Sequence, residues 1–137
     1  MKKTLKIVAV ILLVAFIALQ FYRPNLTNPP IVEAETLDTT TQVPENVAAI
    51  LKRSCSDCHS NETVYPWYSN ITPFSSLLAE HIEEGRRELN VSIWNTYSAK
   101  KKRNKFDEIC EQVTTDEMPH NQYLWIHGDA RLSEEDK

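Results

Sequence analysis

The stretch from Cys55 to His59 reads Cys-Ser-Asp-Cys-His, and it constrains this chain more than any other feature. Two thiols separated by two residues can reach the two vinyl groups on one edge of a porphyrin and form thioether bonds with them. The imidazole of the next residue then lies under the ring, where it can bind iron. The motif therefore predicts that Cys55 and Cys58 attach one haem c covalently and that His59 is the proximal ligand.

Three other interpretations of the motif compete with haem attachment. A zinc site needs further ligands at paired spacing, and the remaining candidates form no second pair: Cys110, His81, His120 and His127. A thioredoxin-like redox pair usually lies in a βαβ pattern, which this chain lacks. A structural disulfide across two residues is the simplest alternative. Covalent haem is the interpretation that we favour.

Length and composition favour one small helical domain. The chain has 137 residues, and roughly ninety remain for a core once the amino-terminal segment is set aside, which is near the marginal size. A covalent haem would add a large apolar element to such a core. Only 2 residues are Gly, which suits helices better than hairpins. The net charge of −4 gives no reason to expect nucleic-acid binding.

The amino terminus has the pattern of an export signal. Lys2, Lys3 and Lys6 precede an apolar run over residues 7–19, and no small-x-small cleavage site follows. With its flanks the run reaches about the lower length limit of a transmembrane helix. We therefore expect residues 1–23 to be an uncleaved signal-anchor in preference to a cleaved signal. Either would place the rest of the chain outside the cytoplasm, in the periplasm, because the lysines stay inside.

A tether and a first helix are expected between this segment and the motif. Residues 24–43 are rich in Pro, Thr, Asn and acidic residues without apolar periodicity, which is typical of a flexible linker. Residues 44–137 would then form the haem-binding domain. A helix over 44–54, with Val47 and Leu51 on one face, would lead directly into Cys55.

The chain after the motif supplies further candidates for the haem site. Trp67 and Tyr68 could pack on the porphyrin edge, although ordinary loop packing explains them equally well. A helix is expected to begin at Thr72-Pro73. His81 lies on its apolar stripe, where a histidine is usually a hydrogen-bonded core residue, but a nearby haem makes it an alternative distal ligand.

Two predictions concern residues 90–113. The basic run of Lys100–Arg103 and Lys105 could be a docking face for an acidic partner, although a solvated helix end or linker is the commoner explanation. Phe106, Ile109 and Val113 then predict a short amphipathic helix, and we expect Cys110 on its apolar side, in the core.

Met118 is the candidate for the sixth position on the iron. It precedes Pro119 at the expected end of a helix, and a thioether on a Pro-stiffened loop can fill the open position of a haem with one His ligand. His81, His120, His127 or an open position are the alternatives.

In combination these segments resemble the haem-binding domain family of c-type cytochromes found in membrane-tethered bacterial proteins. The matching stretches are Cys55–Thr63, Tyr65–Asn70, His81–Arg86, Glu117–Pro119 and His127–Ser133. The resemblance implies haem c on Cys55 and Cys58 with His59 as proximal ligand, and similarity to small mono-haem cytochromes supports Met118 as the distal ligand. It also implies a helix after Ser133, which would be truncated here.

The expected fold is therefore mainly α, a small c-type cytochrome-like helical domain around one covalent haem. The expected function is one-electron transfer at the outer face of the cytoplasmic membrane, between redox partner proteins, and not enzyme catalysis. The alternatives are a haem-based gas or redox sensor, which requires a weak distal ligand, and a peroxidase-like enzyme, which requires an open iron beside an acid-base group such as His81.

Overall fold

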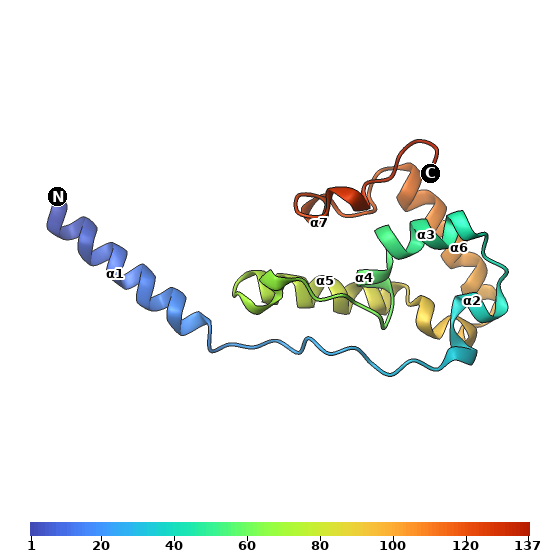
Figure 1. The fold of residues 1–137 in the computed structure, drawn as a ribbon, viewed down its shortest axis with the longest axis horizontal. Coiled ribbons are helices and arrows are strands. Elements are labelled where there is room, and N and C mark those ends of the chain that lie inside the picture. Colours follow the sequence, from blue (N-terminus) through green and yellow to red (C-terminus); the bar gives the residue numbers. More distant parts are fainter. The chain divides into compact units, whose positions relative to one another are not determined.

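The computed structural model describes residues 1–39 and 41–137 in full and Thr40 by its backbone only. Every regular element in this described part is helical, which confirms the mainly α prediction (Figure 1). The α-helices are α1 (Lys2–Leu19), α2 (Leu37–Thr40), α3 (Glu45–Ser54), α4 (Ser56–His59), α5 (Phe74–Glu88), α6 (Ala99–Thr114) and α7 (Asn121–Leu124). Short 3-10 turns are η1 (Glu33–Glu35), η2 (Trp67–Asn70), η3 (Val91–Thr96) and η4 (Gly128–Ala130).

The chain divides into two compact units, which are described separately. The first unit comprises residues 1–27 and 65–81, and the second comprises residues 28–64 and 82–137. The Cys-x-x-Cys-His motif and Met118 belong to the second unit. The domain boundaries expected after residues 23 and 43 stay a prediction.

Helix α1 presents all its side chains to solvent, because none of them is buried. Across the described residues, no helix combines the length and hydropathy that a bilayer span requires. The transmembrane segment expected within residues 1–23 is therefore not supported.

Within the first unit, the chain after α1 is hydrogen-bonded to the segment before α5. The Gln20 amide accepts a hydrogen bond from the Thr72 backbone N–H (3.1 Å) and donates one to the Thr72 carbonyl (3.0 Å). Arg23 donates to the Asn70 carbonyl at 2.7 Å. The end of the apolar segment is thus fixed to residues 70–72.

The second unit contains a core that begins earlier in the chain than the sequence suggests. Leu37 is buried with Trp94 and Tyr97, and Val43 packs against this cluster. Leu37 and Val43 lie within residues 24–43, so these two residues of the expected tether belong to the core of the second unit. An isolated Leu has no periodicity, which is why the sequence pattern missed this contact.

The predicted helix before the motif is confirmed, whereas α6 differs from its prediction. Helix α3 covers Glu45–Ser54. Helix α6 begins at Ala99, with the Ser98 hydroxyl accepting from the Lys101 N–H, so the basic run is its first turns and not a linker. Lys101 Nζ lies 3.8 Å from the centroid of the Tyr97 ring.

Cys110 is exposed, which corrects its expected place in the core. The partly buried stripe of α6 runs through Lys102, Lys105, Ile109 and Val113. Alkyl stems of lysine can cover apolar surface while their charged ends stay in water, so two basic residues take part in this stripe. Cys110 follows Ile109 by about 100° around the helix and falls outside it.

The carboxyl terminus forms a capping arrangement between Ser133 and Asp136. The Ser133 hydroxyl accepts from the Asp136 N–H at 3.2 Å, and the Asp136 carboxylate accepts from the Ser133 N–H at 2.9 Å. Asp136 also pairs with Arg53 of α3 at 3.1 Å. This pair fixes the terminus to the helix that leads into the motif.

Candidate functional site

The motif lies at the junction of two helices in the second unit. Cys55 ends α3 and precedes α4, which contains the remaining motif residues. The Cys55 carbonyl accepts from the N–H groups of Cys58 (3.2 Å) and His59 (2.9 Å). This single helical turn places both thiols and the imidazole on one short rigid element. Both thiols are free and partly buried.

Burial raises the pKa of the Cys55 thiol to about 11. Burial also raises the pKa of Cys58 to about 11, and the nearby Asp57 carboxylate adds to that rise. Both thiols are therefore protonated at neutral pH. A thioredoxin-like pair needs a depressed thiol pKa, so these surroundings do not favour the redox-pair interpretation.

The ring orientation of His59 is set by two backbone carbonyls at the end of α5. Its Nδ1 lies 3.0 Å from the Gly85 oxygen and 3.1 Å from the Leu89 oxygen. A carbonyl can only accept, so Nδ1 carries the proton and the lone pair of the neutral ring lies on Nε2. The carboxyl end of a helix carries partial negative charge, which makes the N–H bond at this place favourable. Metal-binding histidines are commonly oriented by this kind of second hydrogen bond.

Gly85 allows α5 to approach the motif closely. A Cβ atom at this position would lie 2.6 Å from the Cys58 carbonyl oxygen and 3.0 Å from the Cys58 Cβ. Any larger residue would therefore force the two segments apart. The sequence pattern does not reveal this role of Gly85, although an isolated glycine inside a helix often has a packing reason.

Arg86 fixes the loop that follows the motif. Its Nε donates to the Ser60 carbonyl at 2.8 Å, and its Nη2 donates to the Thr63 hydroxyl at 2.9 Å and to the Asn28 side chain at 2.7 Å. The guanidinium thus connects α5, the motif loop and the start of the second unit. Arg86 therefore has a structural role in the second unit.

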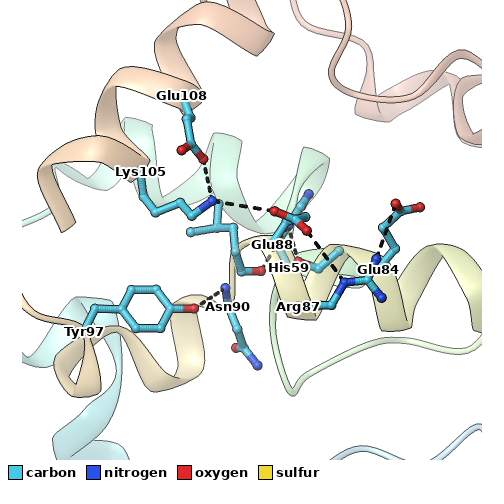
Figure 2. Close-up of polar contacts among 10 residues, drawn as sticks. His59, Glu84, Arg87, Glu88, Asn90, Tyr97, Lys105 and Glu108 are labelled. Carbon is cyan, nitrogen blue, oxygen red and sulfur yellow. Dashed lines mark hydrogen bonds and ion pairs between the residues drawn. The ribbon is translucent and has the colours of Figure 1, made fainter. Parts of the chain in front are cut away.

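A buried network of hydrogen bonds also holds the loop that follows the motif. Asn61 receives a hydrogen bond from the Asn90 amide at 2.8 Å, and its N–H donates to the Ser92 hydroxyl at 3.0 Å. Figure 2 shows the Asn90 N–H donating to the Tyr97 hydroxyl, which is 3.1 Å away. Buried polar groups that are all paired in this way hold one conformation.

Ion pairs connect α5 to α6 beside this network (Figure 2). Lys105 of α6 pairs with Glu88 of α5 at 3.8 Å and also contacts Glu108. Arg87 pairs with Glu88 at 3.6 Å and with Glu84 at 3.5 Å. Lys105 is therefore engaged within the unit and is a poor candidate for the docking face considered above.

Asp57, between the two cysteines, connects the motif to α7. Its carboxylate accepts from the Val64 N–H at 3.0 Å and from the Tyr123 hydroxyl at 2.7 Å. The Tyr123 ring is stacked on His127, with centroids 4.2 Å apart and an interplanar angle of 6°. This contact could not be predicted, because nothing in the sequence pattern connects Asp57 to a tyrosine 66 residues away.

Met118 lies in the turn between α6 and α7 and is exposed to 37%. Its N–H donates to the Gln112 carbonyl at 3.1 Å. Asp116 adopts a φ of 60°, the left-handed conformation that often ends a helix. Lys137 pairs with Asp116 at 2.6 Å. The backbone of the turn is thus well fixed, while the role of Met118 as distal ligand stays a prediction.

Three other predicted residues belong to the first unit. Tyr68 is buried, Trp67 is exposed to 77%, and their rings meet edge to face with centroids 5.9 Å apart. His81 is partly buried near the middle of α5. Haem packing by Trp67 and Tyr68, and iron binding by His81, remain predictions.

The donors that the motif presents fit a covalently held haem. Two neutral thiols stand one helical turn apart, and the adjacent imidazole has its lone pair on the nitrogen that iron would bind. In the described part of the chain, no group of three or more His, Cys, Asp or Glu side chains is arranged to hold a metal ion.

Comparison with known proteins agrees with this donor set. A family model described as a haem-binding domain matches residues 14–137. No curated protein and no solved structure matched the chain in these comparisons.

Proposed function

The chain belongs to the haem-binding domain family, and on this premise we propose that it is a c-type cytochrome-like protein that transfers single electrons. The observation that carries the proposal is the His59 ring, held by Gly85 and Leu89 so that Nε2 is available beside two free thiols. Bound haem iron would supply a centre that changes oxidation state by one electron.

Covalent attachment requires no oxidant or reductant. Cys55 and Cys58 would each hold the haem by a thioether bond: the thiol S–H would add across a vinyl group, with sulfur bonding to one vinyl carbon and the proton going to the other. The pKa values near 11 keep both thiols protonated before the addition. Asp57, Arg86 and the buried network hold the motif and its loop in place, so the attachment points have little freedom to move.

We propose Met118 as the second axial ligand. It lies in a turn whose backbone is fixed at Gln112 and at Asp116, in the same unit as His59. A thioether ligand raises the reduction potential and leaves no position for a substrate, which favours an electron carrier over an enzyme. The exposure of Met118 also leaves a gas or redox sensor as a second candidate, since a weak distal ligand can be displaced.

We place the domain outside the cytoplasm. Lys2, Lys3 and Lys6 before an apolar helix are typical of an exported chain, and attachment of haem to this motif occurs in bacteria after export. Redox proteins at the membrane are then its expected partners. A fusion to a reporter enzyme that folds only outside the cytoplasm would be active if this placement is correct and inactive otherwise.

Haem staining of a denaturing gel tests the attachment. The chain is produced in a host with the attachment machinery, as wild type, as the double variant Cys55→Ser/Cys58→Ser and as Cys110→Ser. We expect stain in the wild type and in Cys110→Ser, and little or none when both motif cysteines are replaced. An unstained wild-type band would refute covalent attachment.

Two spectra separate the carrier from the sensor. A methionine-to-iron charge-transfer band in the ferric protein, lost in Met118→Ala, would support the carrier. Rapid carbon monoxide binding by the reduced wild type, with no effect of Met118→Ala on the ferric spectrum, would support the sensor instead.

A further inference from the structure

The segment that follows α6, residues 115–127, carries Met118 and is fixed to the rest of the second unit at several points. At its start, the N–H groups of Glu117 and Met118 both donate to the Gln112 carbonyl, at 3.0 and 3.1 Å. Lys137 pairs with Asp116 in the same turn. These contacts fix the beginning of the segment, which we call the distal strap, to α6 and to the carboxyl terminus.

The far part of the distal strap is connected to the motif itself. The Tyr123 hydroxyl donates to the Asp57 carboxylate at 2.7 Å, a short bond to a charged acceptor. Such bonds are roughly twice as strong as bonds between neutral groups. Asp57 immediately precedes Cys58, so the strap is bonded to the same helical turn that presents the thiols and His59.

Both oxygens of the Asp57 carboxylate are in use. One accepts from the Val64 N–H at 3.0 Å, where the motif loop ends, and the other accepts from Tyr123. The Thr63 hydroxyl adds a bond to the Asp57 carbonyl at 2.6 Å. A carboxylate has two acceptor oxygens, whereas the amide of Asn has one. An Asn at this position could therefore satisfy one of the two donors but not both.

The Tyr123 ring has a second contact that keeps it in place. It is stacked on His127, four residues later, and the His127 N–H donates to the Tyr123 carbonyl at 3.0 Å. Removing the hydroxyl alone would leave the stacked ring intact. The bond to Asp57 can thus be tested without removing the packing of α7.

We propose that Tyr123 and Asp57 are positioning residues for the distal ligand, forming a latch that holds the strap and Met118 in place relative to His59. This inference rests on the proposed function, because it assigns a role towards the same haem. Neither residue contacts the iron in this account. They would act by limiting the motion of the strap, and so would determine how often Met118 leaves the iron.

The first test measures the strap directly, by amide hydrogen exchange on the full chain as purified. Tyr123→Phe should speed exchange of the Met118 and Leu124 amides about tenfold or more, because a bond to a charged acceptor is lost. Asn95→Ala, which removes bonds to the Ala34 and Thr36 carbonyls elsewhere in the unit, should not do so. Unchanged exchange in Tyr123→Phe would overturn the latch.

The second test measures the iron. In Tyr123→Phe and in Asp57→Asn, the methionine-to-iron band should weaken and carbon monoxide should bind the reduced protein about tenfold faster, which corresponds to about 1.4 kcal/mol. The double variant should be affected no more than the more strongly affected single variant, because both substitutions act on the same bond between Tyr123 and Asp57. Additive effects, or a wild-type spectrum in both single variants, would overturn the proposal.

These outcomes separate the latch from the proposed function. A wild type without covalent haem refutes the attachment, and the exchange measurement still decides whether Tyr123 restrains the strap. A wild type with haem, whose spectrum does not change in Met118→Ala, refutes Met118 as ligand and with it the positioning role. If the wild type carries covalent haem and its spectrum changes in Met118→Ala, but Tyr123→Phe and Asp57→Asn behave as wild type, only the latch is refuted.

Discussion

Gly85→Ala tests the contact between α5 and the motif. The new Cβ would lie 2.6 Å from the Cys58 oxygen, and ordinary contact requires at least 3.4 Å, so α5 and α4 must separate by most of an ångström. Overpacking of this kind costs about 1–3 kcal/mol. Replacing Gly by Ala inside a helix stabilises the helix by about 1 kcal/mol. Lengthening the bonds from His59 to Gly85 and Leu89 costs up to about 1 kcal/mol more.

These contributions sum to a loss of about 0–3 kcal/mol in the free energy of unfolding, and the central value of about 1.5 kcal/mol would lower Tm by roughly 6–12 °C for a domain of this size. The assay is denaturant unfolding of the haem-loaded chain, with the exchange rate of the His59 Nδ1–H proton measured in parallel by NMR. That proton should exchange faster in the variant, because its two acceptors move away.

Gly128→Ala is the matched control. A Cβ at this position meets nothing within 4 Å, so the variant should be unchanged or more stable by about 0.4–1 kcal/mol. If Gly85→Ala were as stable as Gly128→Ala, with an unchanged His59 proton, the close approach of α5 would not matter and the reasoning would be refuted.

Three further predictions concern other residues. Arg86→Met should lower stability by about 1–3 kcal/mol, because Ser60 and Thr63 lose a charged donor, and should raise amide exchange in the motif loop; unchanged exchange would contradict the role of Arg86. Cys110→Ser should change the free energy of unfolding by less than about 0.5 kcal/mol and leave the haem stain unchanged, since the side chain is exposed. A large loss of stability in denaturant unfolding would show that Cys110 packs in the core. Hydrogen bonds from the Ser133 backbone and side chain, then the charge of Arg53, hold the pKa of Asp136 below its usual value. The wild type should therefore be more stable than Asp136→Asn above about pH 4 and lose that advantage as pH falls through the folded pKa, and a pH-independent difference in unfolding would contradict this.

Part of this structure could be predicted from sequence pattern. The helix before the motif was predictable because Val47 and Leu51 repeat at helical spacing, and the Ser133–Asp136 cap was predictable because both partners are three residues apart. The exposure of Cys110 could not be predicted, because a residue at the margin of an apolar stripe can fall on either side of it. The burial of Leu37 could not be predicted either, because one apolar residue in a polar segment gives no periodicity.

The hydrogen-bond partners of His59 and Asp57 could not be predicted from the sequence. The motif identifies His59, but its orienting partners are backbone carbonyls, which every residue possesses, so nothing marks Gly85 and Leu89 as acceptors. The bond between Asp57 and Tyr123 joins residues far apart in the chain, and only the fold brings them together. Such partners follow from tertiary packing and not from local pattern.

The intact mass of the exported wild-type chain, measured after denaturation, tests the central claim most directly. Because thiol addition to a vinyl group loses no atoms, we predict the mass of the polypeptide plus one complete haem. We also predict the bare polypeptide mass when Cys55 and Cys58 are both replaced by Ser. A wild-type chain at the bare polypeptide mass, from cells that load other c-type cytochromes, would contradict the account.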